Sequence, residues 1–188
     1  MTRLWLVRHG PTHAKSMVGW SDIPADLSAT AAIARLRDYL PDAPVVSSDL
    51  IRATATADAL GRDRRLPHDP ALREINFGAW ELRTFREVEA EDPTTIRAYW
   101  DTPGHIAPPG GESWNAVRRR VDDAIDGYLT AGHPDLIVVA HFGMILTQVQ
   151  RALAIGAYAA FGHKIDNLSV TDLHYDGGWT VGRINHIP

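Results

Sequence analysis

Three short apolar segments each end in side chains that can bind or attack an anion. These segments and their following residues are 4–7 with Arg8 and His9, 45–46 with Ser48 and Arg52, and 136–140 with His141. Arginine presents a planar fork that matches phosphate oxygens, and helix N-termini add unpaired amide donors. Two arginines and two histidines brought to one place therefore predict a site for a phosphoryl group.

A neutral imidazole beside these cations is a nucleophile. Attack on phosphorus forms a phosphohistidine and divides a difficult hydrolysis into two easier displacements. The leaving oxygen then needs a proton donor, and Glu74 is our candidate because a carboxyl group partly desolvated near Phe77 or Trp80 can stay protonated at working pH. Glu81 lies in the same loop, and from the residues alone either glutamate can reach the leaving group.

The elements around these residues predict how they meet. Apolar runs without alternation suit buried parallel strands, and helical periodicity follows the second and third of them. Between the first two runs, Ser28 is positioned to cap a helix that carries Ile33, Leu36 and Leu40. Ligands of open α/β sheets bind beyond the carboxyl ends of the strands. We therefore predict an α/β three-layer sandwich with a central, mostly parallel sheet and helices on both faces.

The rest of the chain supplies helices and an edge to this sheet. Thr84 and Glu87 form a capping-box pattern, Pro93 suits the start of another helix, and Ser113 suits the cap of a long amphipathic helix ending near Gly132. The segments 168–175 and 179–184 flank a glycine turn and predict an antiparallel hairpin. The segment 101–111 is rich in proline and glycine and predicts a surface loop.

Composition limits the classes of function. With 188 residues, 45% hydrophobic and 22% charged, the chain suits a single domain, residues 1–188, with a buried core. A formal net charge of -4 argues against a general nucleic-acid partner, and we interpret the run 118–120 of three arginines as a solvated helix face. There is no cysteine. No segment approaches the roughly 18 apolar residues of a membrane span, so we expect a cytoplasmic protein without a membrane partner.

Six segments, in order, resemble one known family. They include Arg-His-Gly-Pro-Thr at 8–12, Gly-Trp-Ser-Asp-Ile-Pro at 19–24, and the segments 47–57, 73–81, 109–113 and 139–143. Together they are similar to the histidine phosphatase superfamily, the phosphoglycerate mutase-like group, from about Leu4 to the last strand. One Arg-His-Gly motif has low specificity, whereas several segments with the right order and spacing are specific.

The resemblance implies roles for individual residues. It implies that His9 is the phosphorylated nucleophile, that Arg8, Arg52 and His141 bind the phosphoryl oxygens, and that Glu74 is the general acid and then the base that activates water. These side chains would carry the charge that metal ions carry in other phosphotransferases, so we expect no metal and no cofactor. The segment 73–111 is expected to be an insertion that caps the substrate. Further substrate contacts are predicted at Thr12, Lys15, Trp20, Ser21 and Phe142.

The chain departs from the family pattern at three places. Lys15 stands where the family often has asparagine, and we hypothesise that it contacts phosphate or a second anionic group. Phe142 and Gly143 replace the usual two glycines, and Leu82 replaces a common glycine after Trp-Glu. None of these changes removes a catalytic side chain. His13 lies four residues from His9, but Gly10 intervenes and no carboxylate pattern completes a metal site.

These observations predict a metal-independent phosphomonoesterase, a phosphoric monoester hydrolase like the histidine acid phosphatases, acting on a small soluble phosphorylated substrate. One alternative is a phosphoglycerate mutase-type phosphotransferase. Family mutases carry an arginine-histidine-tyrosine run after the acid, whereas Ile75, Asn76 and Phe77 follow Glu74 here, which favours hydrolysis. A second alternative is a non-catalytic phosphate-binding regulatory module. The sequence leaves open the physiological substrate and whether the protein is a monomer or a homodimer.

Overall fold

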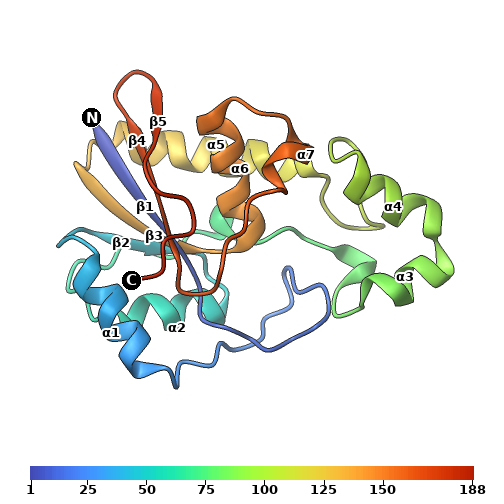
Figure 1. Cartoon of the computed structure of the whole chain (residues 1–188), viewed down its shortest axis with the longest axis horizontal. Coiled ribbons are helices and arrows are strands. Elements are labelled where there is room, and N and C mark those ends of the chain that lie inside the picture. Colours follow the sequence, from blue (N-terminus) through green and yellow to red (C-terminus); the bar gives the residue numbers. More distant parts are fainter.

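The computed structural model describes residues 1–188 as five strands, seven α-helices and two short 3-10 helices (Figure 1). In chain order these are β1 (Thr2–Arg8), α1 (Thr30–Tyr39), β2 (Val45–Ser47), α2 (Ile51–Ala59), η1 (Pro70–Leu72), η2 (Gly78–Trp80), α3 (Phe85–Glu91), α4 (Pro93–Asp101), α5 (Trp114–Thr130), β3 (Asp135–Ala140), α6 (Phe142–Leu153), α7 (Ala157–Ala160), β4 (Val170–Tyr175) and β5 (Trp179–Val181). None of the helices has the length and apolar character that a membrane span requires.

The strands form one mixed sheet in the order β2-β3-β1-β4-β5. β1 and β2 both run parallel to β3, whereas β4 is antiparallel to β1, and β5 is antiparallel to β4. The mostly parallel sheet with an antiparallel edge is therefore confirmed. In the register, Arg8 pairs with Ala140 and Ser47 pairs with Val139, so three strands end at the same edge of the sheet.

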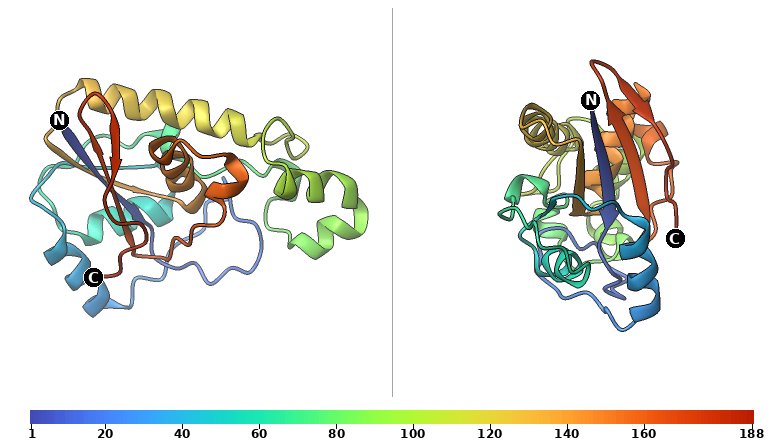
Figure 2. Two further views of the ribbon diagram at one scale, coloured as in Figure 1. Left: turned by 45° about the horizontal axis from the view of Figure 1, so that its top comes forward. Right: turned by 90° about the vertical axis from the view of Figure 1, so that its left-hand side faces the viewer.

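Alternate residues of the strands enter two hydrophobic cores, one on each face of the sheet. The core shared with α1 and α2 includes Trp5, Val7, Ile137 and Val139. The core shared with α5 and α6 includes Leu4, Leu6, Leu136 and Val138. Because successive side chains point to opposite faces, a strand buried on both faces is apolar without alternation. Figures 1 and 2 show helices on both sides of the sheet, as the three-layer prediction requires.

The helices α3 and α4 project to one side of the molecule (Figure 2). Thr84 and Glu87 form the predicted capping box at α3, and the Asp92 side chain caps α4, in which Pro93 is the first residue. Aromatic contacts attach these helices to the body: the ring centroids of Trp80 and Tyr99 lie 5.4 Å apart. The segment after Asp101 contains no helix or strand until α5, which agrees with the predicted loop.

Several predicted boundaries are shifted. Ser28 does not cap α1, whose N-cap is Ala29 without a side-chain hydrogen bond. Because the helix begins at Thr30, Ser28 lies one position before the N-cap, and its own N–H donates to the Asp26 carboxylate. Ser113 does cap α5, and this helix ends at Thr130, near Gly132 as predicted, with Gly132 at φ 76° just beyond the C-cap. The strands of the C-terminal hairpin are shorter than predicted and are joined by a turn with Gly177 at φ 76°.

Candidate active site

A cavity of about 170 Å³ opens beside the carboxyl ends of the parallel strands. Six predicted site residues line it: Arg8, His9, Thr12, Arg52, Glu74 and Phe142. His141 lies directly behind His9, with the two ring centroids 5.1 Å apart. The sheet therefore brings together side chains from four distant parts of the sequence, as the strand-end argument predicts.

His9 follows the last residue of β1 and is 6% exposed. Its Nδ1 lies 2.6 Å from the carbonyl oxygen of Gly10, which places the ring proton on Nδ1 and leaves the Nε2 lone pair free. Burial, with smaller effects of Arg52 and Arg8, lowers the pKa of His9 to about 3. A neutral imidazole with an unprotonated Nε2 is the form that attacks phosphorus.

His141 follows β3 and is completely buried. Its Nε2 is 2.6 Å from the Ser48 hydroxyl, whereas its buried Nδ1 has no partner in the protein. Burial first, and then the proximity of His9 and of the cations Arg52 and Arg8, lowers the pKa of His141 well below its ordinary value. An unpartnered polar atom at this depth costs free energy unless a ligand or water binds it.

Two guanidinium groups, of the half-buried Arg8 and the buried Arg52, supply the positive charge of the site. Arg8 donates to the carbonyl of Ile165 at 2.6 Å, and its buried Nε has no partner. Arg52 is 1% exposed and donates to the carbonyls of Gly19 and Ser21. Burial lowers the pKa of both arginines, and the Glu74 carboxylate opposes this effect. Arginine stays charged under such conditions, so two cations share the site with the carboxyl group of Glu74 and two neutral imidazoles.

Glu74 reaches the cavity from the loop between η1 and η2, and it is 7% exposed. The N–H of Gly143, in the first turn of α6, donates to both of its carboxylate oxygens. The N–H of Ile75 donates to Oε1 at 3.0 Å. The carboxyl group of Glu74 is therefore fixed in the wall of the cavity that it shares with His9.

Glu81, the other glutamate considered, does not line the cavity. Its carboxylate accepts hydrogen bonds from the N–H groups of Gly19, Trp20, Ser21 and Phe77 and from the Ser21 hydroxyl. Burial alone raises the pKa of Glu81, but these hydrogen bonds outweigh it, so the pKa lies below its ordinary value. Glu81 holds the segment 19–21 against the loop of Glu74, and its oxygens are already occupied.

Three predicted substrate contacts are not brought to the cavity. Lys15 is exposed, although its neighbours Ala14 and Ser16 line the wall. The hydroxyl of Ser21 is engaged by Glu81. The indole N–H of Trp20 donates to the carbonyl of Glu74 at 2.9 Å. Trp20 and Ser21 therefore support the loops behind the cavity.

The interpretation of residues 118–120 as a solvated face is wrong for Arg120. Arg120 is half-buried and donates to Glu112 and to the carbonyls of Ala71, Arg73 and Glu74. At 100° per residue, a position three after the buried Val117 flanks the apolar stripe of the helix rather than opposing it. The spacing from Val117 indicates that Arg120 is partly buried. We instead interpreted the three consecutive arginines as one exposed group. Arg119 is exposed, as predicted.

No group of three or more histidine or carboxylate side chains is arranged to hold a metal ion. His13, the histidine considered as a ligand, is exposed and lies 2.8 Å from the Asp26 carboxylate. The charged groups of the cavity itself are Arg8, Arg52 and Glu74.

Comparison with known sequences identifies relatives of this chain. The model of the histidine phosphatase superfamily (branch 1) matches residues 4–187. The adenosylcobalamin/alpha-ribazole phosphatase of Escherichia coli is 31% identical, over 87% of this chain and 85% of that protein. A bifunctional protein of Mycobacterium tuberculosis is 35% identical, over 98% of this chain and 54% of that protein. The chain thus spans about half the length of the mycobacterial relatives it matches.

Solved structures share the fold over the whole chain. YhfR of Bacillus stearothermophilus has a TM-score of 0.90 at 26% identity, covering 100% of this chain and 98% of that one. The mycobacterial glucosyl-3-phosphoglycerate phosphatase has a TM-score of 0.82 at 28% identity, covering 99% of both chains.

Proposed function

Since this chain belongs to the histidine phosphatase superfamily, we propose that it is a metal-independent phosphomonoesterase that hydrolyses a small phosphate ester through a phosphohistidine on His9. One observation carries the proposal: a buried, neutral His9 whose Nδ1 is tied to the Gly10 carbonyl, with Arg8, Arg52 and Glu74 in the same cavity wall. The further subtype, resemblance to histidine acid phosphatases, stays a prediction.

The proposed reaction has two displacements. Nε2 of His9 attacks phosphorus, the bond from phosphorus to the ester oxygen breaks, and Glu74 gives its proton to the leaving alcohol. The carboxylate of Glu74 then takes a proton from water, whose oxygen attacks the phosphohistidine and breaks the phosphorus–nitrogen bond. Inorganic phosphate leaves, while His9 returns to its neutral form and Glu74 to its protonated form.

Fixed donors stabilise the charge that spreads over the phosphoryl oxygens. Arg8 and Arg52 are held by backbone carbonyls on one side, so they need little reorganisation when the substrate binds. If the Ser48 hydroxyl donates to Nε2 of His141, the unpartnered Nδ1 carries the ring proton and serves as a third donor.

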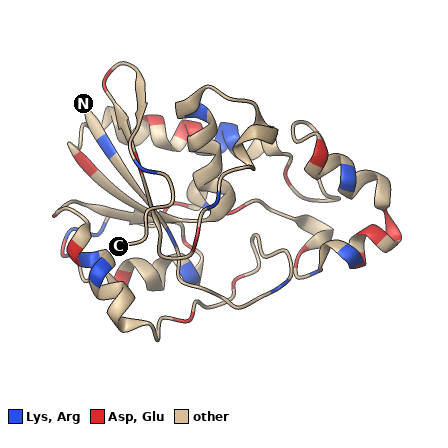
Figure 3. Cartoon of the chain, in the orientation of Figure 1, with Lys and Arg blue, Asp and Glu red and all other residues tan.

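The cavity wall also offers groups to the rest of the substrate. These are the apolar side chains of Ala14, Val18, Phe77 and Phe142 and the hydroxyl groups of Thr12 and Ser16. Phe77 comes from the segment 73–111, which we propose caps the substrate. The relatives named alpha-ribazole phosphatase and glucosyl-3-phosphoglycerate phosphatase suggest the first esters to assay. Basic and acidic residues are interspersed over the ribbon in Figure 3, which supports the expectation that nucleic acid is not a partner.

The test combines turnover with detection of the intermediate. A panel of phosphomonoesters is assayed with a chelator present, and the enzyme is quenched in alkali, which preserves phosphohistidine. We expect His9→Ala to abolish turnover and labelling, while the matched control His13→Ala retains both because His13 is exposed outside the cavity. Unchanged turnover of His9→Ala, or turnover only with added metal, would contradict the proposal. Transfer of phosphate between two sugar acids without net hydrolysis would favour the mutase alternative.

A further inference from the structure

Arg120 uses every hydrogen-bond donor of its side chain within the protein. Nη1 donates to the carbonyls of Ala71 at 2.8 Å and Arg73 at 3.0 Å. Nη2 donates to the Glu74 carbonyl at 3.2 Å and to Glu112 Oε2 at 2.8 Å, and Nε donates to Glu112 Oε1 at 2.9 Å. A guanidinium group has five N–H donors, and these contacts occupy all five. Arg120 therefore has no donor left for a substrate, and its contacts concentrate on the backbone that leads to Glu74.

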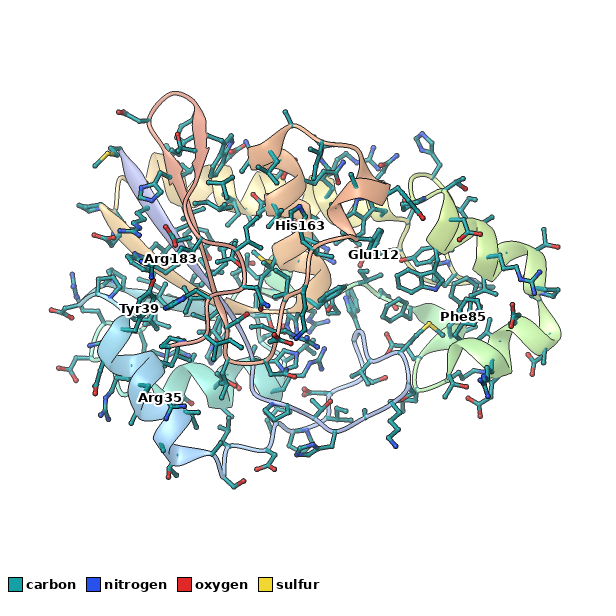
Figure 4. All side chains as sticks on the ribbon, in the orientation of Figure 1. Arg35, Tyr39, Phe85, Glu112, His163 and Arg183 are labelled. Carbon is teal, nitrogen blue, oxygen red and sulfur yellow. The ribbon has the colours of Figure 1, made fainter.

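Glu112 holds the other side of the same loop. Its Oε2 accepts the N–H of Asn76 at 2.9 Å, and its own N–H donates to the Asn76 carbonyl at 2.8 Å. Arg120 and Glu112 are each less than 20% exposed, so their ion pair is shielded from solvent more than a surface pair. Figure 4 labels Glu112 where the body of the protein meets the helices α3 and α4. The pair thus holds the chain both before and after Glu74.

The side chain of Glu74 is anchored separately from its backbone. Gly143, on α6, binds the carboxylate, whereas Arg120, on α5, binds the carbonyl of the same residue. The loop has irregular conformation between η1 and η2, so no helix or strand hydrogen bonds fix it. A displacement of about 1 Å at a catalytic group is enough to lower a rate strongly.

We propose that Arg120 and Glu112 form a clamp that positions Glu74 for proton transfer to the leaving oxygen. Neither residue lines the cavity, so both act through Glu74 and are positioning residues. The inference rests on the proposed function, because it takes Glu74 as the general acid. Lysine cannot replace Arg120, since an ammonium group has three donors and no planar fork that spans a carboxylate and three carbonyls.

The test uses the dependence of the rate on the leaving group. An ester such as 4-nitrophenyl phosphate has a good leaving group and needs little proton donation, whereas an alkyl phosphate needs it fully. We expect Arg120→Lys to lower kcat/KM, which reports the transfer of phosphate to His9, about 10- to 100-fold on an alkyl phosphate and less than about threefold on 4-nitrophenyl phosphate. Inhibition by vanadate is expected to change little, because Arg8 and Arg52 are untouched. Glu112→Gln, which weakens the pair from the other partner, is expected to show the same selectivity.

Two further variants separate the possible failures. Arg118→Lys is the matched control, because Arg118 lies on the same helix in an i,i+4 pair with Asp122, and it is expected to match the unmodified protein. Glu74→Gln calibrates the effect of losing the acid. Suppose that Glu74→Gln lowers kcat/KM on the alkyl ester more than on the aryl ester. If Arg120→Lys and Glu112→Gln then lower kcat/KM equally on both esters, or on neither, the clamp is overturned. If Glu74→Gln itself does not discriminate, the acid assignment in the proposed function fails, and the clamp fails with it.

Discussion

The backbone N–H of Gly143 donates to both carboxylate oxygens of Glu74, at 2.9 Å and 3.1 Å. A Cβ at Gly143 would overlap Oε1 of Glu74 and would lie 2.9 Å from Cδ1 of Ile75. Position 143 therefore requires glycine for close approach, not for an unusual backbone angle. Position 142 has no such constraint, and Phe142 lines the cavity with its ring 5.4 Å from the Arg8 guanidinium.

The first prediction follows from this contact. Gly143→Ala is expected to displace the Glu74 carboxylate and lower kcat on alkyl phosphates about 10- to 100-fold. Steady-state kinetics on alkyl and aryl esters measures the effect. Gly127→Ala is the control, since a Cβ at this α5 position meets nothing within 4 Å. Equal activity in the two variants would show that the contact does not matter.

Protonation of His9 is expected to be absent throughout the neutral and mildly acidic range. Burial lowers the pKa of His9 to about 3, so its imidazole stays neutral well below the ordinary histidine value. NMR titration of histidine-labelled protein from pH 8 to pH 5 should show no protonation of this ring. His13→Asn and His9→Asn assign the resonances. A midpoint for His9 near 6.5 would contradict the buried, neutral nucleophile.

The same shift links stability to pH. Above pH 6.5 His9 is neutral in both the folded and the unfolded protein, whereas between 6.5 and about 3 only the unfolded state binds the proton. Stability is therefore lost as the pH falls through this window. At pH 5 the loss from His9 is about 2 kcal/mol. Urea unfolding at pH 7.5 and pH 5 should show a smaller difference for His9→Asn than for His13→Asn, and equal differences would be inconsistent with the shift.

Glu81→Gln tests whether Glu81 has a structural role while Glu74 is the general acid. The amide loses acceptor capacity for the N–H groups of 19–21 and is expected to destabilise the protein by about 2 kcal/mol. Vanadate should also bind more weakly, because Arg52 is anchored on the carbonyls of Gly19 and Ser21. The exposed Glu91→Gln is the control. The ratio of activities on alkyl and aryl esters should stay unchanged in Glu81→Gln. If this ratio changes in Glu81→Gln but not in Glu74→Gln, Glu81 is the general acid.

Leu82 occupies a backbone conformation that favours glycine. Its φ is 61° and its side chain is 55% exposed, so little packing offsets the strain. Leu82→Gly is expected to leave the free energy of unfolding unchanged or raise it by up to about 1 kcal/mol. The same change at Leu153, an exposed residue of α6, should cost about 1 kcal/mol. If urea unfolding shows that both variants lose a similar free energy of unfolding, this would argue against backbone strain at Leu82.

Local sequence patterns determined the elements and the residues at the ends of the strands. Uninterrupted apolar runs predict β1 and β3, and parallel strands end at one edge of a sheet, so the sequence alone predicts that Arg8, His9 and His141 lie close together. The capping box at α3 and the N-cap of α5 could also be predicted from the sequence, because each depends on residues within one helical turn. The start of α1 is displaced by one residue from the prediction, because Ala29 and not Ser28 is its N-cap.

Only the tertiary structure decided which polar side chains face the cavity. Glu74 and Glu81 lie in one irregular loop, and their different surroundings come from Gly143 in one case and the segment 19–21 in the other. Trp20 and Ser21 have side-chain chemistry suited to substrate contact, but distant backbone and carboxylate groups engage them. For Arg120, the helical spacing from Val117 indicates partial burial, but only the tertiary structure shows that its partners are Glu112 and the carbonyls of Ala71, Arg73 and Glu74. Hydrogen-bond partners far apart in sequence carry no local periodicity, so the sequence alone determined the components of the site, and the packing of the loops determined what each one contacts.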